Sequence, residues 1–282
     1  MKFASLLSLT SLLFAQAPVR IQGSCTPDIV HEIGLDCSQE TPCPIFLELS
    51  AVEMVGNRLL VSGNLHTAVT TLESIMLASE DTGRTWTEVH PRLPQSSIEA
   101  IQFLDYEVGW ASGQVLHPRP RDAFFLLTSD GGKSWRRRPL FSETRTGTVE
   151  AFRFDSRSHG RLLIDRLSGS ENGLRYELWE SMTGGEGWDV RQVDSKPIAL
   201  NVPARAESWR IKPDAAAKVL WLEQKSETRW QNIAAFAIAA GECKPVPPEP
   251  KTELEPQSEP PPSVKPSLKR KNEGKTLDKS LN

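Results

Sequence analysis

Histidines, arginines and glycines are the residues of this chain whose types and spacing could support chemistry. Its histidines, which lack the spacing of metal ligands, are His31, His66, His90, His117 and His159. Residues 136–138 are three arginines in an expected strand, where side chains alternate, so a charged sheet edge is favoured over an anion site. No helix is expected after Gly131 and Gly132, which are interpreted as turn residues and not as a phosphate cradle. The sequence therefore predicts neither a metal nor a cofactor.

Four cysteines are the remaining reactive side chains: Cys25, Cys37, Cys43 and Cys243. An even number of cysteines is typical of an exported protein, and three pairings are open. A bridge from Cys243 to the N-terminal group would hold the two ends of the chain together. In the chain-entropy model it would remove roughly 5 kcal/mol of unfolded-state entropy. Free buried thiols are the alternative.

Residues 1–17 have the features of a signal peptide. Lys2 precedes an apolar run over residues 3–14, and residues 15–17 include the small residues that a signal peptidase needs. A membrane anchor is the alternative, but the run is shorter than the roughly 20 residues that cross a bilayer. Pro18 would hinder cleavage at this point, so the cleavage site stays open. We expect a secreted or periplasmic protein in which residues 18–44 form a cysteine-containing segment.

The composition changes at residue 244. The 39 residues from there to the end include nine prolines and no aromatic residue, which predicts a disordered tail over residues 244–282. The first half of this tail is acidic and its end is basic, so the end could contact an anionic surface. A solvated tail without a partner is the alternative. The net charge of -3 does not favour nucleic acid as a partner of the body.

A repeat of about fifty residues decides the expected fold. Residues 79–86 read SEDTGRTW, and residues 128–135 read TSDGGKSW. A degraded third copy, SMTGGEGW, covers residues 181–188, and a cryptic fourth copy is expected to place its tryptophan at Trp230. The residues assigned to the three clear turns are Ser79, Asp81, Gly83, Trp86, Thr128, Asp130, Gly132, Trp135, Ser181, Gly185 and Trp188.

Each of these turns is expected to close a β-hairpin. Aspartate side chains can accept hydrogen bonds from the backbone N–H groups that follow them, and glycines permit positive φ. A unit of about fifty residues holds about four short strands, the size of one propeller blade. We therefore expect an all-β propeller of about four blades over residues 45–243. A closed ring, an open set of blades and an irregular fifth blade all stay open.

The turn motif resembles the Asp-box, or bacterial neuraminidase repeat. The spacing of Phe103, Asp105, Gly109 and Trp110 resembles the propellers of the photosystem II stability and assembly factor type. In those families the motif is a structural turn remote from the ligand face, so the resemblance implies a fold more than a function. It implies a non-enzymatic binding or scaffolding protein of the cell envelope, with a protein or glycan partner.

A sialidase-like glycan hydrolase or a carbohydrate-binding protein is the alternative. Sialidases are similar in using a propeller, but theirs has six blades, three arginines that bind a carboxylate, and a tyrosine paired with a glutamate. Tyr176 stands beside Glu177, but neighbours in a strand face opposite ways. Three arginines within hydrogen-bond distance of Glu177 or Asp165 would favour the hydrolase. Tryptophans that could stack on a sugar, but are expected in the core, are Trp110, Trp179, Trp209 and Trp221.

Overall fold

A computed structural model describes residues 17–167, 173–200 and 208–244 of the chain. All but the last residue of the predicted signal peptide lie outside the described residues, as do all but the first residue of the predicted tail. No helix in the described part is long and apolar enough to span a membrane.

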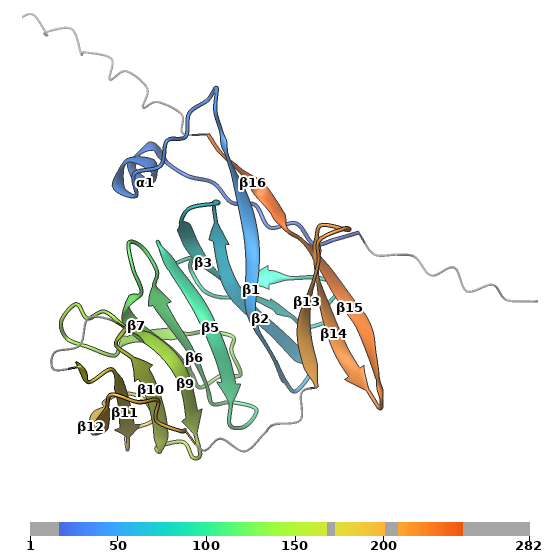
Figure 1. Cartoon of the computed structure of the whole chain (residues 1–282). Helices are drawn as coiled ribbons and strands as arrows, with labels where there is room; N and C mark the ends of the chain where they lie inside the picture. The colour runs from blue at the N-terminus through green and yellow to red at the C-terminus, as the bar shows by residue number, and fades with distance from the viewer. Residues whose placement is uncertain (1–16, 168–172, 201–207, 245–282) are drawn as a thin grey trace, which may run out of the picture. The chain divides into compact units, whose positions relative to one another are not determined.

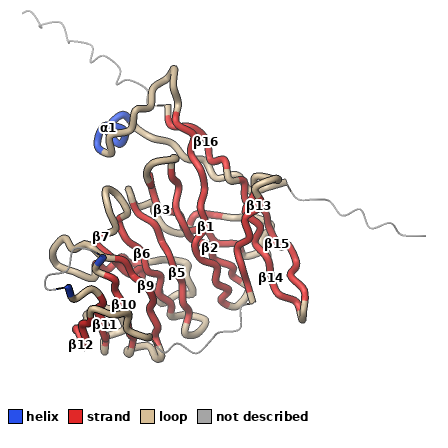
Figure 2. Tube along the Cα trace, in the orientation of Figure 1, coloured by secondary structure: helices blue, strands red, loops and turns tan. Residues whose placement is uncertain are grey.

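The described residues form four antiparallel sheets and one short helix, α1 (Pro27–Glu32) (Figures 1 and 2). Sheet 1 has the order β16-β1-β2-β3-β4 and consists of β1 (Cys43–Val55), β2 (Arg58–His66), β3 (Thr71–Ser79), β4 (Thr87–Glu88) and β16 (Ala239–Cys243). Sheet 2 consists of β5 (Ser96–Phe103), β6 (Gly109–Val115), β7 (Arg121–Thr128) and β8 (Arg136–Pro139). Sheet 3 consists of β9 (Thr148–Phe154), β10 (Gly160–Asp165), β11 (Tyr176–Ser181) and β12 (Asp189–Asp194). Sheet 4 consists of β13 (Trp209–Asp214), β14 (Val219–Ser226) and β15 (Arg229–Ala237).

The predicted all-β fold with about four blades of antiparallel sheet is confirmed. In sheets 2 and 3 each strand pairs with the next strand along the chain. In both, a phenylalanine at the end of the first strand pairs with a glycine at the start of the second: Phe103 with Gly109, and Phe154 with Gly160. A Cβ atom at Gly109 would come within 2.6 Å of the Phe103 ring, so glycine is what allows the ring to lie over the strand.

Three hydrophobic clusters fill the spaces between the sheets. Sheets 4 and 1 share a cluster that includes Phe236 and Leu65, and sheets 1 and 2 share one that includes Leu60. Sheets 2 and 3 share a third cluster, in which Trp110 stacks on Phe154 with a ring separation of 3.8 Å. Among the described residues, none of these clusters joins sheet 3 to sheet 4. Hydrophobic packing therefore does not close a ring between these two sheets, although they are consecutive in the sequence.

The two ends of the described chain complete sheets 4 and 1. Val19 lies parallel to β15, beside Phe236, and its N–H donates to the carbonyl of Ala235 at 2.7 Å. At the other end, β16 leaves sheet 4 and pairs with β1 of sheet 1. The last sheet is thereby joined to the first by both ends of the chain.

The prediction that Trp230 is the tryptophan of a fourth copy of the turn motif is wrong, because Trp230 lies one strand too early in its sheet. Trp230 is the second residue of β15, just after the turn between the second and third strands of sheet 4. The motif in sheets 1 to 3 instead follows the third strand. Within the described residues sheet 4 has three strands of its own, and residues near Val19 lie along the edge of β15. Sheet 4 therefore lacks the turn after its third strand that would carry the motif, and the connection from β15 to β16 of sheet 1 takes its place.

Candidate functional site

The first of three marker turns, residues 79–86, is built by side chains that accept backbone N–H groups. The Ser79 hydroxyl oxygen accepts from the N–H of Gly83 at 2.8 Å. Oδ1 of Asp81 accepts from the N–H groups of Arg84 and Thr85 at 3.0 and 2.8 Å, and Oδ2 accepts from the Thr85 hydroxyl at 2.7 Å. These bonds, with the Thr85 N–H as the largest cause, lower the pKa of Asp81 to about 2.

The second marker turn, residues 128–135, repeats this geometry. The Thr128 hydroxyl oxygen accepts from the N–H of Gly132 at 3.0 Å. Oδ1 of Asp130 accepts from the N–H groups of Lys133 and Ser134, both at 3.0 Å, and Oδ2 accepts from the Ser134 hydroxyl at 2.6 Å. Burial raises the pKa of Asp130, but the hydrogen bonds from Ser134 outweigh it and bring the pKa to about 2.

The third marker turn, residues 181–188, lacks the carboxylate. The Ser181 hydroxyl oxygen accepts from the N–H of Gly185 at 2.9 Å, as in the other two turns. Thr183 stands where the others have aspartate, and its hydroxyl oxygen accepts from the N–H of Gly187 at 2.9 Å. Residue 187 offers no hydroxyl donor, so this turn has fewer and uncharged hydrogen bonds.

The marker tryptophans pack between neighbouring sheets. Trp86 of sheet 1 lies 5.0 Å from Phe236 of sheet 4, and Trp188 of sheet 3 lies 5.3 Å from Phe125 of sheet 2, measured between ring centroids. Trp135 packs against the cluster between sheets 1 and 2. The tryptophans of the marker turns thus join sheet 1 to sheet 4, sheet 2 to sheet 1 and sheet 3 to sheet 2.

The four cysteines form two disulfides. One joins Cys25 to Cys243 and the other joins Cys37 to Cys43. Cys43 begins β1 and is the register partner of Cys243 at the end of β16. The two bridges therefore meet where β1 pairs with β16.

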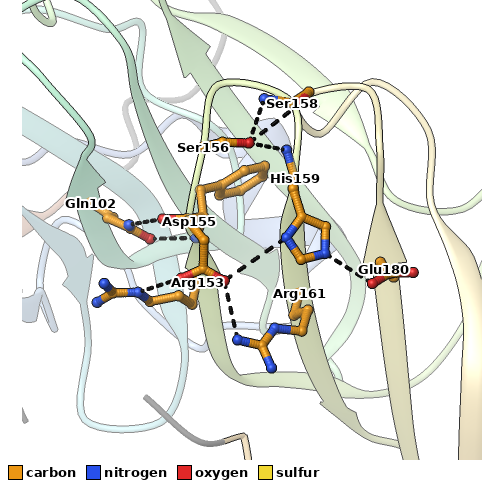
Figure 3. Close-up of polar contacts among 9 residues, drawn as sticks. Gln102, Arg153, Asp155, Ser156, Ser158, His159, Arg161 and Glu180 are labelled. Atoms are coloured by element: carbon orange, nitrogen blue, oxygen red, sulfur yellow. Dashed lines mark hydrogen bonds and ion pairs between the residues drawn. The ribbon is translucent and has the colours of Figure 1, made fainter. Parts of the chain in front are cut away.

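A network of charged side chains covers one face of sheet 3 (Figure 3). Asp155 accepts hydrogen bonds from Arg153 and Arg161, each at 3.1 Å. Burial raises the pKa of Asp155, but the bonds and charges of the two arginines outweigh it and hold the pKa below its usual value. His159 Nε2 lies 2.9 Å from Glu180. In the described part of the chain, no group of three or more His, Cys, Asp or Glu side chains is placed to hold a metal ion.

This polar face has apolar counterparts in the preceding sheets. Arg161 follows the glycine that starts the second strand, and Trp110 holds that position in sheet 2 and is buried against sheet 3. Leu162 and Ile164 alternate with Arg161 and belong to the cluster with sheet 2, so Arg161 faces the other way. A polar outer face is typical of the last unit in a repeat array.

Five further side chains, which we call the arginine cluster, gather at the end of sheet 3 opposite its marker turn: Phe141, Arg145, Arg166, Glu177 and Trp179. Phe141 and Arg145 precede β9, Arg166 follows β10, and the other two lie in β11. Oε1 of Glu177 lies 3.8 Å from Nε of Arg166 and 3.9 Å from Nη2 of Arg145. Its other oxygen accepts from the Trp179 indole N–H at 2.9 Å.

Arg166 is the exceptional member of the arginine cluster. The residue is 9% exposed, and its buried Nη1 atom has no hydrogen-bond partner. Its guanidinium lies 5.9 Å from the centre of the Phe141 ring, and that of Arg145 lies 4.8 Å from the same ring. Burial lowers the pKa of Arg166. With two guanidinium groups around one carboxylate, the arginine cluster has an excess of positive charge and an unused donor.

The arrangement expected of a sialidase-like hydrolase is present only in part. Arg175 binds Asp165 through two hydrogen bonds of 2.6 and 2.5 Å. The two arginines near Glu177 stand beyond hydrogen-bond distance. Among the described residues, one arginine rather than three therefore reaches these carboxylates. Trp110 and Trp179, at 1% and 8% exposed, lie in the core as expected and present no sugar-stacking surface.

The sequence alone did not identify the arginine cluster. Phe141 and Arg145 lie in a link between two sheets, and Arg166 lies in a hairpin connection, so no short motif contains them. One usable signal is an arginine directly after the buried run from Leu162 to Asp165, where a turn residue would be usual.

Comparison with known proteins gives a likeness of fold only. No known protein family matches the chain, and no curated protein matches it. A solved structure of YCF48 bound to D1 peptide matches with a TM-score of 0.38 and 15% identity, over 68% of this chain and 56% of that one. YCF48 from Cyanidioschyzon merolae matches with a TM-score of 0.29 and 17% identity, over 66% and 58%. The GH74 xyloglucanase from Xanthomonas campestris matches with a TM-score of 0.32 and 14% identity, over 70% and 29%. The matched region thus spans little more than half of either YCF48 chain.

Proposed function

We propose that the chain is an exported, non-enzymatic binding protein of the cell envelope, and that it holds a protein partner at the arginine cluster. The observation that carries this proposal is the buried, unpartnered nitrogen of Arg166. An unsatisfied buried donor costs about 1–3 kcal/mol, and more when it is charged. Its presence is accounted for if a partner that binds over the partly exposed Arg145 displaces the Arg166 side chain and supplies the missing acceptor.

The chemistry of the arginine cluster favours an acidic group on that partner. The two positive charges of Arg145 and Arg166 exceed the single negative charge of Glu177. A guanidinium binds a carboxylate through paired hydrogen bonds. The partly exposed ring of Phe141, which packs on the buried Trp179 ring at 5.4 Å, adds an aromatic surface beside the charge. An aspartate, a glutamate or a chain-terminal carboxylate next to an apolar side chain matches both properties.

Export is supported by the cysteines and the N-terminus. Two disulfides are typical of proteins that fold in an oxidising compartment. The apolar run and small residues of the predicted signal peptide agree with a secreted or periplasmic location. The predicted contact of the basic tail with an anionic surface belongs to the same proposal, and that segment lies outside the described residues.

A non-enzymatic role is supported by how the candidate catalytic groups are engaged. Glu177 accepts from the Trp179 indole and faces Arg145 and Arg166, and Asp165 is bound by Arg175. A glycan that bears a carboxylate is the alternative ligand, because the same arginine cluster could bind it.

The test measures binding of the full-length protein to short synthetic peptides by the fluorescence of its tryptophans. We expect a peptide with a glutamate between two leucines to bind at least tenfold more tightly than its glutamine counterpart. Arg166→Gln should abolish this preference, whereas Arg191→Gln, on the exposed strand β12, should preserve it. Equal binding of both peptides, or an unchanged preference in Arg166→Gln, would reject the proposal. Binding or cleavage of a sialylated sugar that depends on Arg166 would support the alternative.

A further inference from the structure

We infer that the four cysteines form a thiol-driven exchange switch that can transfer the link on β16 from Cys25 to Cys43. Cys43 and Cys243 face each other in the antiparallel ladder of β1 and β16. Residues that are directly opposite in such a ladder have Cα atoms about 4.5–5.5 Å apart, which lies within the range of disulfides. In the structure, however, Cys43 is bonded to Cys37 and Cys243 is bonded to Cys25. Because Cys43 and Cys243 are already at a suitable distance, a disulfide between them can form without moving either strand.

Exposure decides which sulfur of the Cys25–Cys243 bond an external thiol attacks. Cys243 is fully buried, whereas Cys25 is partly exposed. The thiolate of a small reduced thiol therefore attacks Sγ of Cys25 and forms a mixed disulfide there, and Cys243 leaves as a thiolate. Burial disfavours a free thiolate, so the Cys243 thiolate is driven to react with a sulfur close to it.

The second step uses the ladder partner. The Cys243 thiolate attacks Sγ of Cys43, a new Cys43–Cys243 bond forms, and the Cys37–Cys43 bond breaks. Cys37 leaves as a thiolate and takes a proton from water. Two disulfides and one thiol exist before and after the two steps, so no oxidant is needed and the external thiol stays on Cys25.

The exchange would change how one sheet edge is held. At present the Cys25–Cys243 bond ties the N-terminal segment to β16, next to the hydrogen bond from the Gly23 N–H to the Ala240 carbonyl at 2.6 Å. After exchange, the covalent link joins β1 to β16 directly. The N-terminal segment is then held only by non-covalent contacts, such as the backbone bonds of Val19 to β15 and the packing of Ile21, so a partner strand can compete for that edge.

The experiment exposes the full-length protein to reduced glutathione at concentrations that leave its tryptophan fluorescence native. Free thiols are then alkylated, and the disulfides are mapped by mass spectrometry of unreduced digests. We expect a Cys43–Cys243 peptide, glutathione on Cys25, and alkylation of Cys37 rising from near zero to a majority of the chains. Alkylation confined to Cys25 and Cys243, or to Cys37 and Cys43, with no Cys43–Cys243 peptide, would overturn the inference.

A variant gives the same answer without added thiol. In Cys25→Ser we expect the Cys43–Cys243 bond and a free Cys37, whereas a retained Cys37–Cys43 bond with a free Cys243 would count against the switch. The double variant Cys25→Ser, Cys243→Ser is the matched control and should show no alkylation, because no thiol remains to attack the Cys37–Cys43 bond. If Cys25→Ser does not fold, the glutathione experiment on the unaltered chain decides.

Discussion

Replacing Asp130 by asparagine tests whether the marker turns hold the fold together. The substitution keeps the size of the side chain, and its oxygen can still accept from the N–H groups of Lys133 and Ser134. It removes the charge and the acceptor for the Ser134 hydroxyl. Hydrogen bonds to a charged group contribute about 1.5–3 kcal/mol, against about 0.5–1.5 for neutral ones. Because the turn is largely exposed and solvent screens the charge, we expect a loss of about 1–2 kcal/mol in the free energy of unfolding at pH 7.

The pH dependence of this loss makes the test specific. The pKa of Asp130 is about 2 in the folded protein, against an ordinary value of 3.8. Since folding lowers this pKa, the stabilisation is present above pH 3.8 and disappears as the pH falls through 2. The difference between the two proteins, measured by urea unfolding with tryptophan fluorescence, should therefore narrow between about pH 4 and pH 2.

Two results would refute this reasoning. One is equal stability of Asp130→Asn and the unaltered protein at pH 7. The other is a difference that stays constant down to pH 2, which would mean that the charge of the carboxylate is not what stabilises the turn. Asp189→Asn, at an exposed position on β12, is the control and should leave the unfolding curve unchanged.

The remaining predictions concern other single positions. Thr183→Asp should restore a charged acceptor in the third marker turn and raise the free energy of unfolding by about 1 kcal/mol, which a rightward shift of the urea curve would show. Gly63→Ala should prevent folding or cost more than about 3 kcal/mol, because a Cβ there would overlap the Glu48 carbonyl oxygen; a native circular dichroism spectrum at full stability would contradict it. Trp110→Ala, at a residue 1% exposed, should cost about 3–5 kcal/mol by urea unfolding, and more than Trp135→Ala, whose tryptophan is only partly buried; the reverse order would contradict the packing described here.

The fold was largely predictable because its repeat has marker residues that do one physical job each time. Asp81 and Asp130 accept from N–H groups at equivalent positions of their two turns. The spacing of these aspartates therefore indicated the first two sheets of the repeat. Ser181, Gly185 and Trp188 kept the third copy recognisable although Thr183 replaces the aspartate, and Thr183 still accepts one backbone N–H group. Only the marker turn of sheet 4, predicted to end at Trp230, was misplaced, because the last edge of this sheet is completed from the other end of the chain, near Val19, and leaves no local motif.

The arginine cluster was beyond sequence reasoning for a different reason. It is assembled from segments that are far apart in the chain, and Arg166 stands out only because its buried nitrogen has no hydrogen-bond partner in the folded protein. From the sequence, a pair of Glu177 with Tyr176 was rejected, and Glu177 was named only as a residue that three arginines would reach in a hydrolase. The structure places it near two arginines and an indole.

Because β16 pairs with β1, the order of the sheets along the sequence differs from the order in which they pack in space. Sheet 4 is translated last, yet it packs against sheet 1 and not, within the described residues, against sheet 3. A circular permutant that joins the residues after Cys243 to Val19 and opens the chain between β12 and β13 would be translated in the order in which the sheets touch. In that permutant every hydrophobic cluster would form between consecutive units, and the longest loop closure in folding would disappear.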